Sequence, residues 1–350
     1  MPSLPFECPP ASPLGGSWRY QGLVLICALS TACAAPASGA ASPAPEAART
    51  SAAPLESRWE SLLDRGHPLV GRIWDVGRQR FIEATVLAEQ VRRSRFVAIG
   101  EQHDNVDHHR LEALLLDAVS DTRHPAVVFE MLDIEKQSAV DAAATASPGD
   151  PDALADAVDW RRSGWPPFSL YRPIFAVAAT RRLSVVAGGV DRFAAHRIAH
   201  AGLSALPPEM VRRFGLSLPL DANAERGLRD EMRDAHCGML PESMLDAMAL
   251  IQRVRDAELA LEVSSSDAGQ GAVLIAGNGH VRNDRGAPRT FARGTGESLL
   301  SVALIEVRGE WTEPRAYAAE FAANTLPFDY VWFTPRASDE DHCAELRAKP

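Results

Sequence analysis

The sequence is short of lysine and of cysteine. Lysine occurs only at Lys136 and Lys349, so arginine supplies nearly all of the positive charge in a chain of 350 residues whose net charge is -10. That acidic balance argues against a nucleic-acid-binding function, which depends on a basic face. Five cysteines are too few for a disulfide scaffold or a cysteine-based zinc module. The composition, with 46% hydrophobic and 23% charged residues, is that of a globular protein.

The first 32 residues have the features of a signal peptide. Residues 22–29 (GLVLICAL) form an apolar run that is too short to span a bilayer. Residues 29–33 (LSTAC) resemble a bacterial lipobox, which predicts lipidation of Cys33. The alternative is ordinary cleavage at an A-x-A pattern such as residues 32–34 (ACA). Residues 33–58 are rich in Ala, Pro and Ser and are expected to form a tether. We therefore expect an exported, membrane-anchored protein of the bacterial cell envelope.

The pattern of an α/β domain begins at residue 59. Strands are expected at residues 95–99, 126–129, 183–187, 272–276 and 301–307. Helices are expected at residues 104–121, capped by Asp104 and with Leu111, Leu114, Leu115 and Ala118 in one stripe, and at residues 241–263. The alternation predicts a single domain over residues 59–335 with a mostly parallel or mixed central sheet flanked by helices. A helical insertion is expected at about residues 190–240, and residues 336–350 form a tail.

Polar side chains follow three of these expected strands. Two copies of G-x-x-H occur, one from Gly100 to His103 and one from Gly277 to His280, and glutamates stand at Glu101 and Glu130. Ligands of open α/β sheets bind outside the carboxyl ends of the strands, where these residues fall. Two imidazoles and two carboxylates suit a divalent metal or a general base held by carboxylates. The alternative is a structural role at loop carbonyls and helix N-termini.

Two helices carry further candidates. The stripe of the first helix places His108 on the inward face of that helix. There it would be a ligand of the site, a residue that contacts a ligand, or an ordinary packed histidine. His109 is expected at the surface or at an interface. On the second helix, Arg255 and Asp256 continue apolar stripes. A charged residue on a buried stripe must form an ion pair or take part in a functional site. The methionines at 232, 239, 244 and 248 are expected to fill the core. A disulfide between the cysteines at 237 and 343 would be compatible with an oxidising compartment.

Six segments carry a family resemblance: residues 97–119 (VAIGEQHDNVDHHRLEALLLDAV), 129–131 (FEM), 171–175 (YRPIF), 236–238 (HCG), 252–260 (QRVRDAELA) and 276–288 (AGNGHVRNDRGAP). Their order and spacing resemble those of the ChaN-like haem-binding lipoproteins, a family related to the Tiki/TraB group and to erythromycin esterases. The resemblance covers roughly residues 68–307. It implies an α/β envelope lipoprotein associated with haem or iron uptake, and it places the family site at Glu101, His103, Glu130 and His280.

The resemblance leaves two functions open. The first is a haem-binding protein, with homodimer formation open, whose cofactor contacts are expected among His108, Tyr171, Arg172, Arg255 and Asp256. Haem needs an axial ligand and a broad apolar face, and arginines would pair with its propionates. The second is an ester or peptide hydrolase in which a G-x-x-H histidine activates water, either on a metal or held by the glutamates.

Overall fold

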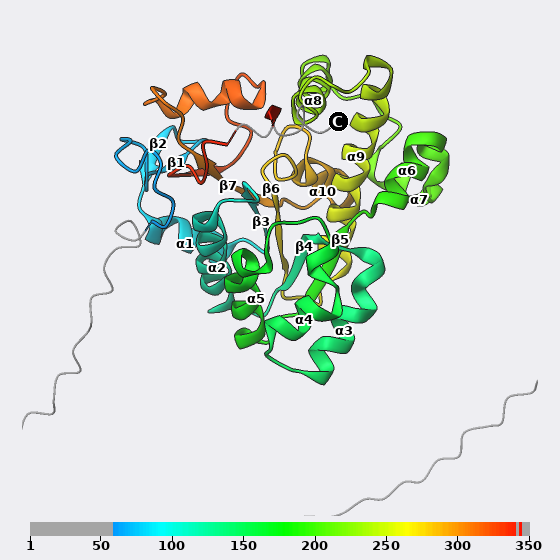
Figure 1. Cartoon of the computed structure of the whole chain (residues 1–350), viewed down its shortest axis with the longest axis horizontal. Coiled ribbons are helices and arrows are strands. Elements are labelled where there is room, and N and C mark those ends of the chain that lie inside the picture. Colours follow the sequence, from blue (N-terminus) through cyan, green and yellow to red (C-terminus); the bar gives the residue numbers. More distant parts are fainter. Residues whose placement is uncertain (1–58, 341–342, 345–350) are drawn as a thin grey trace, which may run out of the picture. The chain divides into compact units, whose positions relative to one another are not determined.

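The computed structural model describes residues 59–340 and 343–344 (Figure 1). At its centre lies an eight-stranded sheet in the order β2-β1-β8-β7-β3-β6-β4-β5. The strands are β1 (Ile73–Asp75), β2 (Arg80–Ile82), β3 (Phe96–Glu101), β4 (Ala126–Asp133), β5 (Val185–Gly189), β6 (Ala272–Gly277), β7 (Leu300–Glu306) and β8 (Tyr330–Thr334). From β8 to β5 all neighbours are parallel, and β1 is antiparallel to both β2 and β8. The expected mixed α/β fold is confirmed.

Helices cover both faces of the sheet, and this explains why the central strands are continuous apolar runs. The helices are α1 (Ala84–Arg93), α2 (Val106–Ser120), α3 (Gln137–Ala146), α4 (Pro151–Ala157), α5 (Phe168–Arg181), α6 (Arg192–Ala201), α7 (Pro208–Phe214), α8 (Ala222–Ala235), α9 (Glu242–Ser265) and α10 (Ala287–Thr295). Side chains of α1 to α5 share one core with Val97 and Ile99 of β3. Those of α6, α7, α9 and α10 share the other with Phe96 and Ala98. Successive side chains of β3 thus enter opposite cores, as the pleat requires.

The start of α2 differs from the expectation. Asn105, not Asp104, is its N-cap, because the side-chain oxygen of Asn105 accepts hydrogen bonds from the backbone amides of Asp107 (2.9 Å) and His108 (3.2 Å). The Asn105 amide also donates to Glu306, which anchors the start of α2 at the end of β7. The expected stripe is corrected at Leu114, which is 37% exposed, whereas Leu111 and Leu115 are buried and Ala118 is half-buried.

The expected helical insertion at about residues 190–240 contains α6, α7 and α8. Just after α8, Cys237 forms a disulfide with Cys343, with 5.4 Å between the Cα atoms. Within the described part of the chain, no helix combines the length and the apolar character that a membrane span requires. The expected signal peptide, the Cys33 anchor and the whole tether at residues 33–58 lie outside the described residues.

Candidate functional site

The two G-x-x-H segments meet at the carboxyl ends of neighbouring strands. Strand β3 ends at Glu101, β6 ends at Gly277, and these two residues are register partners. Strand β4, on the other side of β6, does not end at Phe129 as expected but continues to Asp133, so Glu130 lies within it. This arrangement gathers all four side chains expected from the strand ends into one cluster (Glu101, His103, Glu130 and His280).

His103 is the accessible member of this cluster. Its Nδ1 lies 2.8 Å from Oε1 of Glu101 and, because a carboxylate only accepts, Nδ1–H is the donor. The side chain is 34% exposed, and its ring meets the edge of Trp165 with 4.8 Å between the ring centroids. Among the described residues, no side chain or backbone group hydrogen-bonds to Nε2. Gly277 leaves room for the imidazole, since a Cβ there would come within 2.9 Å of Nε2.

His280 is held between two carboxylates. Its Nδ1 lies 2.7 Å from Oδ1 of Asp256, and its Nε2 lies 3.2 Å from Oε1 of Glu130. Burial alone would lower the pKa of His280, but the charge of Glu130 and the hydrogen bond to Asp256 raise it to about 10. Burial would likewise raise the pKa of Glu130, but His280 holds it well below its usual value. At neutral pH His280 is therefore an imidazolium between acceptors.

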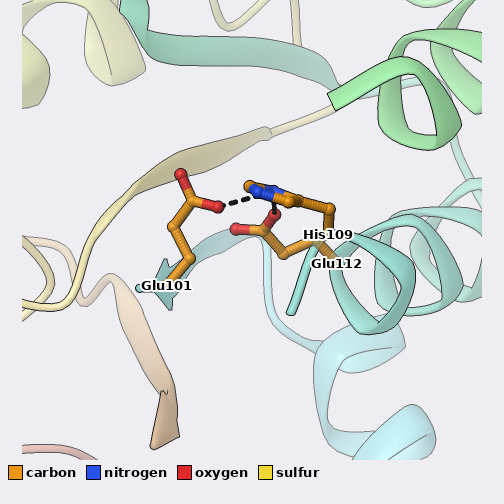
Figure 2. A group of neighbouring side chains, drawn as sticks. All are labelled: Glu101, His109 and Glu112. Carbon is orange, nitrogen blue, oxygen red and sulfur yellow. Dashed lines mark hydrogen bonds and ion pairs between the residues drawn. The ribbon is translucent and has the colours of Figure 1, made fainter. Parts of the chain in front are cut away.

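His109 corrects a prediction: it is fully buried rather than at the surface. Its Nδ1 lies 2.6 Å from Oε2 of Glu101 and 3.2 Å from Oε2 of Glu112, as Figure 2 shows. Its Nε2–H donates to the backbone carbonyl of His103 (3.0 Å). Burial opposes the charge on His109, but Glu101 raises its pKa to about 10. The N-terminal end of α2 is thus tied to the G-x-x-H loop.

The two glutamates beside His109 are in different protonation states. Burial would raise the pKa of Glu101, but the charge of His109 lowers it to about 2. The pKa of Glu112 is raised well above its usual value by burial and by the charge of Glu101. These shifts favour the anionic form of Glu101, the cationic form of His109 and the neutral form of Glu112.

A divalent metal was expected at Glu101, His103, Glu130 and His280. Each imidazole in that set is hydrogen-bonded to a carboxylate. A different trio, Glu101, His109 and Glu112, places one donor atom each within 4.8 Å of one another. The 2.6 Å contact between His109 and Glu101 is an ion pair, and it is closer than two ligands of one zinc ion, which lie roughly 3 Å apart. In this geometry the trio fits a shared proton better than an ion.

The expected haem contacts are dispersed. His108 is fully buried, with Nδ1 accepting from the Gln102 amide (2.8 Å) and Nε2 beside Oγ1 of Thr334 (2.7 Å), and burial lowers its pKa to about 3. Tyr171 is also fully buried, and its hydroxyl donates to Oε1 of Glu101 (3.1 Å). Both side chains are buried and hydrogen-bond to the loop and to the carboxylate of the site, so they hold these groups in position.

The remaining expected contacts differ in exposure. Arg172 is 51% exposed and pairs with Asp152 (2.8 Å). Asp256 is buried against His280. Met232 is buried against α9 as expected, but Met239 and Met244 are exposed rather than core residues. Arg255 lines a cavity and has a buried Nε without a hydrogen-bond partner among the described residues.

That cavity, of about 610 Å³, adjoins the exposed side of the cluster through Trp165. Its lining mixes apolar and charged side chains. The apolar members include Leu132, Trp160, Trp165 and Phe193, and the cationic members are Lys136, Arg162, Arg192 and Arg255. Sequence reasoning missed Trp165, whose only signal was an aromatic residue in a Gly/Pro-rich loop. It also missed Glu112, three residues after His109 on the same helix.

Comparison with solved structures shows the same fold elsewhere. The structure described as cofacial heme binding to ChaN of Campylobacter jejuni has a TM-score of 0.56 and 18% sequence identity, covering 74% of this chain and 95% of that one. The type III effector HopBA1 has a TM-score of 0.39 and 10% identity, covering 79% of this chain and 96% of that one. A search of curated proteins found no match.

The family model described as haem-binding uptake, Tiki superfamily, ChaN matches residues 87–291. The match spans more than half of the chain, from α1 to α10, and includes both G-x-x-H segments, the β4 glutamate and the α9 aspartate. The chain therefore belongs to the ChaN haem-binding uptake family of the Tiki superfamily.

Proposed function

We propose that the protein binds haem and that Nε2 of His103 meets the iron. The observation that carries this proposal is the state of that imidazole. Nδ1 is held by the buried carboxylate of Glu101, no hydrogen bond to Nε2 is formed by the described residues, and the side chain is 34% exposed. A carboxylate behind a ligating histidine fixes its tautomer and raises its basicity, as in many metal and haem sites.

The cavity beside Trp165 supports the second requirement of haem, a broad apolar face. Trp165 contacts His103 on one side and lines the cavity on the other. Arg255 belongs to the same lining, and its buried guanidinium Nε has no hydrogen-bond partner within the described part of the chain; an arginine there suits a propionate. Arg172, the other arginine expected there, is already paired with Asp152 at the surface.

Proton balance sets a pH dependence for this binding. Burial lowers the pKa of His103, but the hydrogen bond from Nδ1 to Glu101 outweighs it, so the pKa is raised above the usual 6.5. Iron requires the neutral imidazole, which is the minor form below that pKa. Haem affinity is therefore expected to increase as the pH rises through the raised pKa of His103.

The cellular part of the proposal is an exported lipoprotein, anchored through Cys33, that participates in haem or iron uptake in the cell envelope. The disulfide between Cys237 and Cys343 supports export, because disulfides persist in oxidising compartments. Homodimer formation stays a prediction from the family resemblance.

We do not propose hydrolysis. A general base must offer a free lone pair near neutral pH. His280 and His109 both have pKa values raised to about 10 by adjoining carboxylates, so both carry a proton at that pH.

The proposal is tested by haemin titration of the purified protein, followed in the Soret band. Wild type should give saturable binding at one haemin per chain, and His103→Ala should abolish the shifted band. The matched control is His124→Ala, which removes an exposed histidine on the loop between α2 and β4 and should bind like wild type. Wild-type binding by His103→Ala, or the absence of a saturable band in wild type, would overturn the proposal.

A further inference from the structure

Helix α6 presents a second pair of histidines, far along the chain from the G-x-x-H segments. His196 and His200 are one helical turn apart, so both imidazoles lie on the same face of the helix. Both side chains are exposed, and their ring centroids are 4.4 Å apart. The two Nε2 atoms lie 3.2 Å apart in a hydrogen bond, which one imidazole donates to the other.

This separation has a chemical meaning. Bonds from zinc to imidazole nitrogens are about 2.0–2.1 Å long, so two nitrogens on one ion lie roughly 2.9–3.4 Å apart for angles between square-planar and tetrahedral. The observed 3.2 Å lies within that interval. On binding, the proton shared by the two imidazoles would leave and both rings would turn so that their lone pairs point at one ion.

The backbone beneath the pair is fixed. Asp191 caps α6 by accepting a hydrogen bond from the Ala194 amide (2.6 Å), and Ile198, between the two histidines, is buried in the core that α9 shares. A site on a packed helix is held more precisely than one on a loop. The only entropy lost on binding is that of the two imidazoles.

We propose that His196 and His200 form a surface site for a borderline divalent transition-metal ion, independent of haem. Imidazole ligands suit Cu²⁺, Ni²⁺ and Zn²⁺, and the usual order of affinities makes Cu²⁺ the tightest. Within the described residues, no third His, Cys, Asp or Glu completes the pair, since the one group of three such donors is Glu101, His109 and Glu112. Water or a ligand from another molecule fills the remaining positions, so the ion is exchangeable.

The site also has a defined place relative to the cavity. Phe193, one turn before His196 on the same face of α6, lines the cavity beside Trp165. The ion would thus be bound near the rim of the cavity, outside its lining. Arg192 and Arg197 on the same helix add positive charge, which favours an ion that retains an anionic co-ligand.

The test is calorimetric titration of the full chain, without a histidine tag and without haemin, using Ni²⁺ alone and then Cu²⁺ alone. Losing one of two chelating imidazoles should weaken this site ~100-fold. His196→Ala and His200→Ala should therefore each bind one equivalent fewer than wild type at micromolar ion. The control His124→Ala, another exposed histidine, should retain that equivalent.

A second measurement separates this site from metal binding elsewhere in the chain. The Cu²⁺ electron paramagnetic resonance spectrum of wild type should show coupling to two imidazole nitrogens, and His200→Ala should lose that signature. Unchanged stoichiometry and spectrum in both α6 variants would overturn the proposal. A failure of haemin binding would leave it untouched, because haemin is absent from the assay.

Discussion

Replacing Glu101 with glutamine tests the charge distribution inside the site. The side chain of Glu101 is fully buried and lies 2.6 Å from Nδ1 of His109 and 2.8 Å from Nδ1 of His103. Glutamine keeps the shape and removes the negative charge. His109 then loses the partner that stabilises its imidazolium form.

The size of the effect follows from the pKa of His109. Glu101 raises that pKa from 6.5 to about 10, so at pH 7 the charged form is favoured by three pH units. Each unit is worth about 1.4 kcal/mol, so Glu101→Gln should lower the free energy of unfolding by about 4 kcal/mol. For ~280 ordered residues this lowers the melting temperature by roughly 7 °C.

The pH dependence has a definite sign. A pKa raised in the folded state stabilises fully below the unfolded value, here 6.5, and the contribution is lost as the pH rises toward 10. The penalty of Glu101→Gln should therefore decrease to about 1–2 kcal/mol at pH 9. Urea denaturation followed by tryptophan fluorescence at pH 6, 7.5 and 9 measures it.

The matched control is Glu112→Gln. Glu112 is also fully buried and contacts the same imidazole, but burial and the charge of Glu101 raise its pKa, which favours its neutral form. Its replacement should cost no more than a neutral hydrogen bond, about 1 kcal/mol. Equal penalties for the two variants, or a Glu101→Gln penalty that stays constant from pH 6 to 9, would refute the assignment of charges.

Three further changes have expected outcomes. Gly277→Ala places a Cβ 2.9 Å from Nε2 of His103 and should weaken haemin binding about 10-fold, because it displaces the imidazole. A Soret titration measures this, and an unchanged affinity would show that the added methyl group does not displace His103. Reduction of the disulfide between Cys237 and Cys343, 106 positions apart, should lower the free energy of unfolding by about 4–5 kcal/mol in urea titrations with and without reductant. Arg282→Met removes a cation that is 1% exposed and should destabilise by about 3 kcal/mol in thermal melts, because its carboxylate partners stay behind.

The strand-end residues were predictable because one rule places them. Continuous apolar runs predict parallel strands, parallel strands align their carboxyl ends, and Glu101, His103, Glu130 and His280 follow those runs. The sequence does not show which strands are neighbours. The four side chains meet because β3, β6 and β4 lie side by side at the centre of the sheet.

His109 was not predictable from its helix alone. The apolar stripe of α2 indicates one inward face, but α1 and α5 both pack on this helix and the β3 loop crosses its N-terminal end, so His108 and His109 are both buried. The pairing of His109 with Glu101 depends on tertiary contacts that no local period encodes. The short strands β1 and β2 were missed for a related reason: three residues each are too few to show a period.

The position of β8 has a consequence for the order in which the molecule is assembled. β8 is the last strand of the chain, yet it lies between β1, the first, and β7. The hairpin of β1 and β2 therefore has no strand to pair with until almost the whole chain has been synthesised. Its pairing with β8 closes the longest loop between two paired strands of the sheet. A fragment that ends before residue 330 would leave β1 and β7 with open edges, and open edges are where separate chains join to one another.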